Sequence, residues 1–392
     1  MTLEEALSSI AAREPVVRAF ATLAGNHAEP CAGPLHGMPI AVKDVFDTAD
    51  LPTAYGSPIW VGHRPRADAA AVALARAAGA VILGKTVTTE FASYTPGATT
   101  NPHDSARTPG GSSSGSAAAV AAGMAQAAFG TQTAGSIIRP AAYCGVVGFK
   151  PSLGAISRAG MKALAESFDC AGTFGRSVAD AARLAAVAAA RPELWPWPDG
   201  SESPVIGLCR TDWWDSAEPA QQQATEAAAR GLEASGLRVV DLPPLGVAWV
   251  NERQSQAIAW DTARAFAWEC AAYPDLLSPK FQAICARGLA LSSEEHALVW
   301  QDLRRARGSV AALFARCDVL VTPSAPGEAP LGLTATGPPT FNRLWSVFGG
   351  PCLSVPFGQG ASGMPLGVQL VGPKGQDLLV LRLGARLQAL TC

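Results

Sequence analysis

The chain has 392 residues, of which 48% are hydrophobic and only 16% are charged, so it is long and apolar enough to bury a large globular core. The formal net charge is −2 and no long run of Lys or Arg occurs, so nothing points to a nucleic-acid partner or to an acidic membrane surface. The nine cysteines are scattered without a C-x-x-C pair. This argues against a disulfide framework or a zinc site and predicts reduced thiols in a cytoplasmic protein.

The N-terminal segment predicts a helix, then a buried strand, then a second helix. Thr2 and Glu5 have the spacing of a capping box at the start of an amphipathic helix. The start is acidic and lacks an unbroken apolar run, so it does not resemble a secretory signal. The apolar residues I-A-V before Lys43 predict a buried strand, and residues 68–78 predict a helix.

Residues 79–86 read G-A-V-I-L-G-K-T, which matches the phosphate-loop pattern G-x-x-x-x-G-K-[ST]. A phosphate loop follows a strand and exposes the backbone N–H groups of its intervening residues. Here the intervening residues 80–83 are themselves predicted to form a buried strand that turns at Gly84, and a helix precedes them. We therefore expect no nucleotide site at this position.

A loop rich in Gly, Ser and Thr is predicted over 95–116. Within it, Gly111–Gly115 reads G-S-S-S-G, the nucleophile-elbow pattern with Ser113 at its centre. An elbow needs a strand immediately before it, and the preceding N-P-H-D-S-A-R-T-P-G cannot be a central strand. Only His296 lies downstream to complete a Ser–acid–His triad, so we expect a mechanism that does not use histidine.

The remaining segments alternate between strands and helices. The apolar run 117–129 is too short to span a membrane and predicts a buried helix, followed by a Gly/Thr loop over 130–136. Residues 210–316 are predicted to be mostly helical. Further strands are predicted over 205–209, 318–322, 352–356 and 367–372, and a last helix over 376–390. This alternation predicts the α/β class.

Lys43 is a candidate base for a serine nucleophile. A serine hydroxyl is a poor nucleophile until a base removes its proton, and the chain has only five histidines. A lysine at the end of a buried strand loses hydration, which favours its neutral form and lowers its pKa. Taken alone, Lys43 is equally consistent with an ordinary lysine at a strand end.

Two loops of small residues provide candidate nucleophiles. Gly110–Ser116 reads G-G-S-S-S-G-S and leads into the Ala-rich helix, and Gly130–Ala142 reads G-T-Q-T-A-G-S-I-I-R-P-A-A. In the second loop, successive backbone N–H groups are able to point at one oxygen, as an oxyanion hole requires; they belong to Thr133, Ala134, Gly135 and Ser136. Each loop alone is also consistent with an ordinary turn.

Together these segments resemble the amidase signature family, whose mark is G-G-S-S-G-G-S followed by a G-G-S-I-R-type segment. Ser136 follows Ser112 at the family's spacing, and the upstream G-x-P-I-x-V-K-D around Lys43 is also present. The resemblance implies that Ser136 attacks the amide, that Ser112, preceded by a cis peptide bond, relays the proton, and that Lys43 accepts it. It also implies a single α/β/α domain around a large mixed sheet over residues 1–392, with no metal and no organic cofactor.

Two departures from the common family pattern bear on the substrate. Gln132 replaces an acidic residue, and Arg139 lies one position later than the usual arginine. Both resemble malonamidase-type members, in which this arginine binds a substrate carboxylate. The resemblance also assigns Thr131 to substrate binding, and Ala134 stands where those members have glycine. Arg139 has a structural alternative, because its five N–H donors are able to tie loop carbonyls together.

The sequence thus predicts an amide hydrolase that forms an acyl-enzyme, with a small carboxylate-bearing amide such as malonamate as the leading substrate class. The alternatives are an amidase for another small aryl, indole or ureido-type amide, and the ammonia-releasing subunit of a transamidase complex. The intact Lys43, Ser112 and Ser136 argue against a non-catalytic relative. We expect the helical stretch 210–316 to shape the substrate entrance and, by analogy, expect a homodimer.

Overall fold

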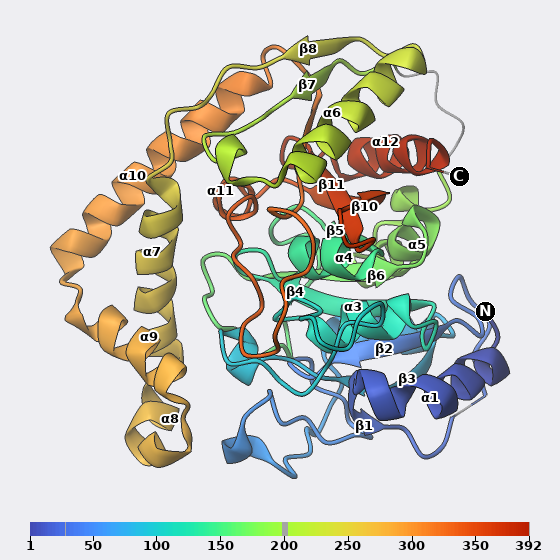
Figure 1. Cartoon of the computed structure of the whole chain (residues 1–392). Helices are drawn as coiled ribbons and strands as arrows, with labels where there is room; N and C mark the ends of the chain where they lie inside the picture. Colours follow the sequence, from blue (N-terminus) through green and yellow to red (C-terminus); the bar gives the residue numbers. More distant parts are fainter. Residues whose placement is uncertain (28, 198–202, 392) are drawn as a thin grey trace.

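The computed structural model describes residues 1–27, 29–197 and 203–391, which form one α/β domain around a large sheet (Figure 1). In these residues the sheet has eleven strands in the order β1-β3-β2-β4-β6-β5-β10-β11-β9-β7-β8. The strands are β1 Phe20–Leu23, β2 Pro39–Lys43, β3 Val81–Thr86, β4 Ala127–Gln132, β5 Val147–Lys150, β6 Cys170–Gly175, β7 Ile206–Leu208, β8 Val239–Asp241, β9 Val319–Pro323, β10 Cys352–Gln359 and β11 Pro365–Val371. Parallel pairing joins β3, β2 and β4, and also β9, β7 and β8, whereas the central pairs are antiparallel. The predicted large mixed sheet is confirmed.

Helices cover both faces of this sheet. They are α1 Leu3–Val17, α2 Ala70–Ala77, α3 Ser114–Ala121, α4 Ile138–Cys144, α5 Val178–Ala188, α6 Pro219–Ala234, α7 Val250–Ala265, α8 Ala267–Ala272, α9 Pro279–Ala290, α10 Ser293–Leu313, α11 Arg343–Phe348 and α12 Asp377–Ala389. Short 3-10 turns are η1 Pro58–Trp60, η2 Glu90–Ala92, η3 Pro192–Leu194, η4 Trp214–Ser216 and η5 Pro274–Leu276. Strand β2 shows the two faces: Ile40 and Val42 pack with α2 and α5, whereas Ala41 between them packs with α1, α3 and α4.

Strand β3 is longer than the sequence indicates. The predicted turn at Gly84 is wrong, because the strand continues through Gly84 to Thr86. A Cβ at Gly84 would lie 2.3 Å from the carbonyl oxygen of Thr22, so the glycine permits close approach of β1 and does not end the strand. Residues 81–86 therefore form one buried strand, and no phosphate loop exists here.

The predicted helix over 117–129 is correct only in its first part. Helix α3 ends at Ala121, Gly123 then adopts a left-handed backbone with φ +69, and Ala127–Gln132 form β4. The predicted loop over 130–136 therefore starts inside a strand. Strand β4 pairs with β2 on one side and β6 on the other, and these hydrogen bonds override the helix preference of alanine.

Residues 210–316 are mostly helical, and their main helices are α6, α7, α9 and α10. One short strand there, β8, was not predicted; it pairs with β7 at the edge of the sheet. Figure 1 shows α7, α9 and α10 along one side of the molecule, and α7 contacts both α9 and α10. In the described residues, no helix combines the length and apolar character that crossing a membrane requires.

The topology brings the residues of the candidate site together at the carboxyl ends of two neighbouring strands. Strands β2 and β4 are parallel neighbours, with Val42 opposite Phe129, so their carboxyl ends lie side by side. Lys43 is the last residue of β2, and Thr131 and Gln132 are the last residues of β4. Loops that leave the carboxyl ends of neighbouring parallel strands are a common place for binding sites.

Candidate active site

Lys43 lies at the centre of the site and is 0% exposed. Its Nζ donates hydrogen bonds to three hydroxyl oxygens: Ser112 Oγ at 2.8 Å, Ser113 Oγ at 3.0 Å and Thr131 Oγ1 at 2.7 Å. Within the described part of the chain, no carboxylate forms an ion pair with it. Burial lowers the pKa of Lys43 to about 7, and the charge of Asp169 opposes this only in part. A lysine in these surroundings is able to accept a proton near neutral pH.

Ser112 reaches Lys43 from the loop that precedes α3. The peptide bond between Gly111 and Ser112 is cis, as the family resemblance implies. Gly110 has φ +81, and a Cβ there would lie 2.9 Å from Pro140 Cα, so glycine allows this loop to pack against α4. Because α4 begins two residues after Ser136, this packing places the Ser112 loop beside the nucleophile segment.

Ser113 and Thr131 support Lys43. Ser113 is fully buried; its Oγ accepts from the Thr131 N–H at 3.2 Å and donates to the Thr131 carbonyl oxygen at 3.1 Å. A buried hydroxyl that bonds to the backbone of β4 in this way does not face a substrate. This agrees with the expectation that Ser113 is not the nucleophile of an elbow. The hydroxyl of Thr131, a residue predicted to bind substrate, accepts a hydrogen bond from Lys43, because β4 lies directly beside β2.

Ser136 lies in the turn between β4 and α4 and is 9% exposed. Among the described residues its hydroxyl has no hydrogen-bond partner. The four backbone N–H groups predicted to form the oxyanion hole also have no partner in the described chain; they belong to Thr133, Ala134, Gly135 and Ser136. Unpaired N–H groups next to a free hydroxyl can stabilise a developing oxyanion.

Gln132 shapes this turn, although the family pattern favours an acidic residue there. Its Oε1 accepts from the N–H groups of Ile137 at 2.9 Å and Ile138 at 3.0 Å, and its Nε2 donates to Ser346 Oγ at 3.1 Å. Ser346 Oγ in turn donates to the Ala134 carbonyl oxygen at 2.7 Å. The neutral amide oxygen of Gln132 thus holds the start of α4, and Ala134 keeps a backbone outside the left-handed region.

Two residues that the sequence analysis did not identify fix the position of Thr133. Asp169 Oδ1 accepts from Thr133 Oγ1 at 2.5 Å, and Gln254 Nε2 donates to the Thr133 carbonyl oxygen at 3.1 Å. Burial raises the pKa of Asp169, and hydrogen bonds from Thr133 and two backbone N–H groups oppose this rise. These partners lie 36 and 121 residues from Thr133 along the chain, so no local pattern indicates them.

Arg139 is 4% exposed and links two loops. Its Nε donates to the Thr336 carbonyl oxygen at 2.9 Å, and its Nη2 donates to Thr336 Oγ1 at 3.3 Å and to the Gly111 carbonyl oxygen. The structural role considered for Arg139 therefore exists. Its Nη1 is buried and has no partner in the described residues, and burial lowers the pKa of Arg139 to about 10. Two of the three guanidinium nitrogens therefore hold the loops together, and the third is unpaired within the described chain.

A cavity of about 520 Å³ lies near Arg139. Thr336 lines this cavity, and its carbonyl oxygen accepts a hydrogen bond from Arg139. Residues 335–338 form one wall of this cavity, and Tyr94 and the α9 residues Lys280 and Ala283 line the rest. The helical stretch 210–316 thus contributes α9 to a hollow beside the candidate site.

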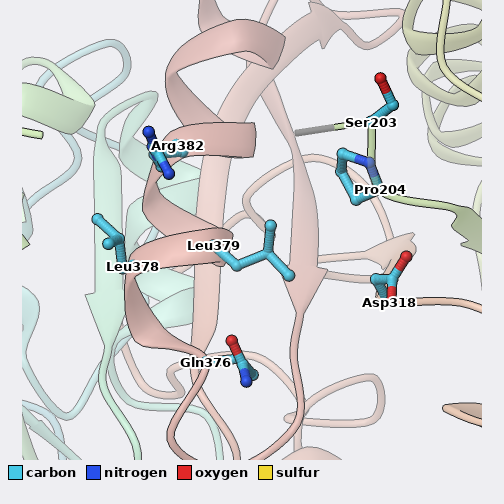
Figure 2. Close-up of a pocket in the computed structure, with 7 residues that line it drawn as sticks. All are labelled: Ser203, Pro204, Asp318, Gln376, Leu378, Leu379 and Arg382. Carbon is cyan, nitrogen blue, oxygen red and sulfur yellow. The ribbon is translucent and has the colours of Figure 1, made fainter. Parts of the chain in front are cut away.

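A second hollow lies away from these residues, where the start of α12 adjoins Asp318 and Ser203 (Figure 2). It measures about 380 Å³, and Gln376 and Arg382 are among its lining side chains. None of the predicted catalytic residues lines it, so we do not assign the reaction to it. In the described parts of the chain, no cluster of three or more His, Cys, Asp or Glu side chains is arranged to hold a metal ion.

The sequence matches a family model described as Amidase over residues 5–381. The glutamyl-tRNA(Gln) amidotransferase A subunit of Chloroflexus aurantiacus is 33% identical over 457 aligned positions, which cover 99% of this chain and 92% of that protein. The aligned positions outnumber the residues of this chain, so that relative has internal segments that are missing here. A solved amidase structure is 32% identical with a TM-score of 0.88 and covers 100% of this chain and 95% of that chain. The peptide amidase from Stenotrophomonas maltophilia is 28% identical with a TM-score of 0.80, covering 99% and 93%.

Proposed function

The chain belongs to the amidase family and is an amide-bond hydrolase, and we propose that Ser136 is its nucleophile, activated by Ser112 and Lys43. One observation supports this assignment above the others. Lys43 is completely buried, its Nζ bonds only to hydroxyl oxygens, and its pKa is lowered to about 7. A lysine without a carboxylate partner is able to act as a base and not merely as a counter-ion.

The proposed reaction begins when neutral Lys43 accepts a proton from Ser112, which takes the proton of Ser136 as that oxygen attacks the amide carbonyl. Negative charge then develops on the carbonyl oxygen, where the unpaired N–H groups of residues 133–136 stabilise it. The proton returns through the same groups to the leaving amine as the C–N bond breaks, and an acyl-enzyme remains. Water, activated by the same base, hydrolyses this ester and restores Ser136.

The acyl-enzyme provides the test of this proposal. Ser136→Ala should lower turnover by about 10⁴-fold or more with the fold retained, because only one oxygen is lost from a partly exposed turn. Mass spectrometry of the wild-type protein, quenched during turnover, should show an acyl group on Ser136. An inactive Ser113→Ala combined with an active Ser136→Ala would instead establish the elbow interpretation.

The substrate class that we propose is a small amide with a free carboxylate, of which malonamate is the example predicted from the sequence. The unpaired Nη1 of Arg139, three residues after the nucleophile, supports this class. Arginine and carboxylate form strong, charge-assisted hydrogen bonds. A neutral aryl or indole amide would leave this donor unpaired. We further propose that residues 210–316 shape the entrance, since α9 lines the adjoining cavity.

The charge of the substrate separates these classes experimentally. Arg139→Ala should reduce kcat/KM for carboxylate-bearing amides by an amount equivalent to about 2–5 kcal/mol of binding free energy, the scale for breaking a buried charged pair. Arg139 also ties two loops together, so some loss of activity on every amide and a lower melting temperature are expected. The informative comparison is between the loss of kcat/KM that the substitution causes on charged amides and the loss on neutral amides of equal size. An equal loss on both would leave Arg139 with a structural role only.

A second candidate is the ammonia-releasing subunit of a transamidase complex. The curated relatives support this interpretation more directly than they support malonamate, since they include glutamyl-tRNA(Gln) amidotransferase A subunits at 33% to 34% identity. Glutamine is also a small amide with a free carboxylate, so the same Arg139 contact would serve either substrate.

Ammonia release by the purified chain separates the two candidates. A free-standing cytoplasmic amidase, which we predict to be a homodimer, should release ammonia from malonamate or glutamine without any other protein. Its mass in solution should be twice that of the chain. Activity that requires added partner subunits would support the transamidase interpretation.

A further inference from the structure

Arg343, the first residue of α11, is a second buried cation next to the pocket and is 9% exposed. Its Nη2 donates to Tyr94 OH at 3.1 Å, and its Nη1 donates to Gln254 Oε1 at 3.3 Å. Both partners are neutral, and in the described residues no carboxylate forms a salt bridge with Arg343. Arg343 is not among the site residues predicted from the sequence.

Arg343 and Arg139 each donate a hydrogen bond to a residue that lines the same cavity. Tyr94, the partner of Arg343, and Thr336, the partner of Arg139, both line the 520 Å³ hollow. The two guanidinium groups are close enough for the charge of Arg343 to lower the pKa of Arg139. Lys280 lines the hollow itself, and among the described residues that line it none is acidic.

Burial of two like charges without a counter-ion is unfavourable, because each ion loses hydration and the two repel one another. An anion bound between them would remove both costs. A carboxylate has two oxygens and is able to accept hydrogen bonds from both guanidinium groups. The charge of this pocket therefore matches a carboxylate ligand.

Arg343 also connects with the nucleophile turn. Gln254 accepts from Arg343 and donates to the Thr133 carbonyl oxygen at 3.1 Å. Thr133 is the first residue of the turn that leads to Ser136. A ligand bound to Arg343 would therefore lie close to Gln254, the side chain that holds the turn with the unpaired N–H groups.

We propose that Arg139 and Arg343 together bind the substrate carboxylate, which makes Arg343 a specificity-determining residue. This inference rests on the proposed amidase function for its choice of substrate. Binding of a simple carboxylate requires no turnover, so it is measured independently of the catalytic assignment of Ser136.

Thermal unfolding of the wild-type chain with malonate, or with neutral malonamide, tests this binding. Malonate at constant ionic strength should raise the melting temperature, because a ligand that binds only the folded state stabilises it, and malonamide should raise it less. Arg343→Gln should strongly reduce the malonate shift. Arg307→Gln is the matched control, since Arg307 is half-buried, has no carboxylate partner among the described residues and bonds to the Val347 carbonyl oxygen away from the cavity. It should leave the shift unchanged.

Kinetics provide a second readout. Arg343→Gln should raise KM for carboxylate-bearing amides by about tenfold or more and should leave neutral amides of equal size nearly unaffected. If Arg343→Gln does not fold, Arg343→Lys retains the charge without the planar fork and should show a smaller malonate shift than the wild type. An unchanged malonate shift in the folded variant, an equal shift with chloride, or equal losses on charged and neutral amides would overturn the proposal.

Discussion

Lys43 and Lys85 lie on the neighbouring parallel strands β2 and β3 and are both fully buried, but their surroundings differ. Lys85 Nζ lies 3.0 Å from Asp44 Oδ1 and donates to Thr53 Oγ1 at 2.5 Å. Lys43 bonds to three hydroxyl groups and no carboxylate. Burial lowers the pKa of both lysines, and at Lys85 the charge of Asp44 opposes this effect. Burial acts on both lysines, so what distinguishes Lys43 is that it has no paired carboxylate among the described residues.

The two environments are adjacent in the sequence as well as in space. Asp44, the partner of Lys85, is the residue that follows Lys43. Asp44 lies in the turn that follows β2, and its carboxylate forms an ion pair with Lys85 and not with Lys43. Because Asp44 pairs with Lys85, Lys43 has no carboxylate partner among the described residues, although an acid follows it directly along the chain.

The largest expected effect comes from Lys43→Arg. Guanidinium keeps the positive charge but cannot release a proton in the working pH range, so kcat/KM should fall by about 10⁴-fold or more. Steady-state ammonia release, with circular dichroism to verify folding, measures this loss. A Lys43→Arg protein with near-normal turnover would remove Lys43 from the mechanism and make the two lysines equivalent.

Lys85→Met should instead affect stability. It leaves Asp44 buried without its cation, which typically costs about 3–5 kcal/mol in the free energy of unfolding. Urea unfolding measures this cost, and turnover per folded molecule should remain close to that of the wild type. The double variant Lys85→Met/Asp44→Asn removes the unpaired charge and should recover part of the stability. Loss of turnover in fully folded Lys85→Met would contradict the contrast between the two lysines.

The pH profile tests the charge state of Lys43. Turnover should rise with pH through about 7 as Lys43 loses its proton. Ser113→Asp would place a carboxylate beside Lys43, raise its pKa and move the profile to higher pH, so that Lys43 resembles Lys85. An unmoved profile in this variant, once folding is verified, would show that another group controls the rate.

The same pKa shift predicts a dependence of stability on pH. The pKa of Lys43 is about 7 in the folded chain, against an ordinary lysine value of 10.5, so between these values the unfolded state binds more protons. The unfavourable contribution of Lys43 to stability is complete below about pH 7 and is relieved as the pH rises toward 10.5. Urea unfolding of wild type and Lys43→Met across this range should therefore show a difference that decreases with pH.

The smallest expected effect is that of Ser113→Ala. It removes one hydrogen-bond acceptor from Lys43 and one from the Thr131 N–H, each worth about 1 kcal/mol. Turnover should fall by about tenfold or less, with a small shift in the midpoint of the pH profile. Loss as complete as that of Lys43→Arg would show that Ser113 takes part in the reaction itself.

The sequence by itself identified the features that are written in short segments. The I-A-V run before Lys43 predicted the buried strand β2, and the spacing of Ser112 and Ser136 carried the family resemblance. Regular alternation of apolar segments predicted the α/β class. Local patterns were insufficient where alanine is small enough for either conformation, as in β4, and where a glycine lies within a strand, as at Gly84.

Only the tertiary structure decided which group each functional side chain meets. The hydroxyl partners of Lys43 lie 69 to 88 residues away along the chain, and Arg139 meets Thr336 across 197 residues. Such contacts depend on strand order and side-chain direction, which no local pattern records. The physical reason is that nearest neighbours set the backbone conformation, whereas the pKa of a buried lysine is set by whatever groups the fold places around it.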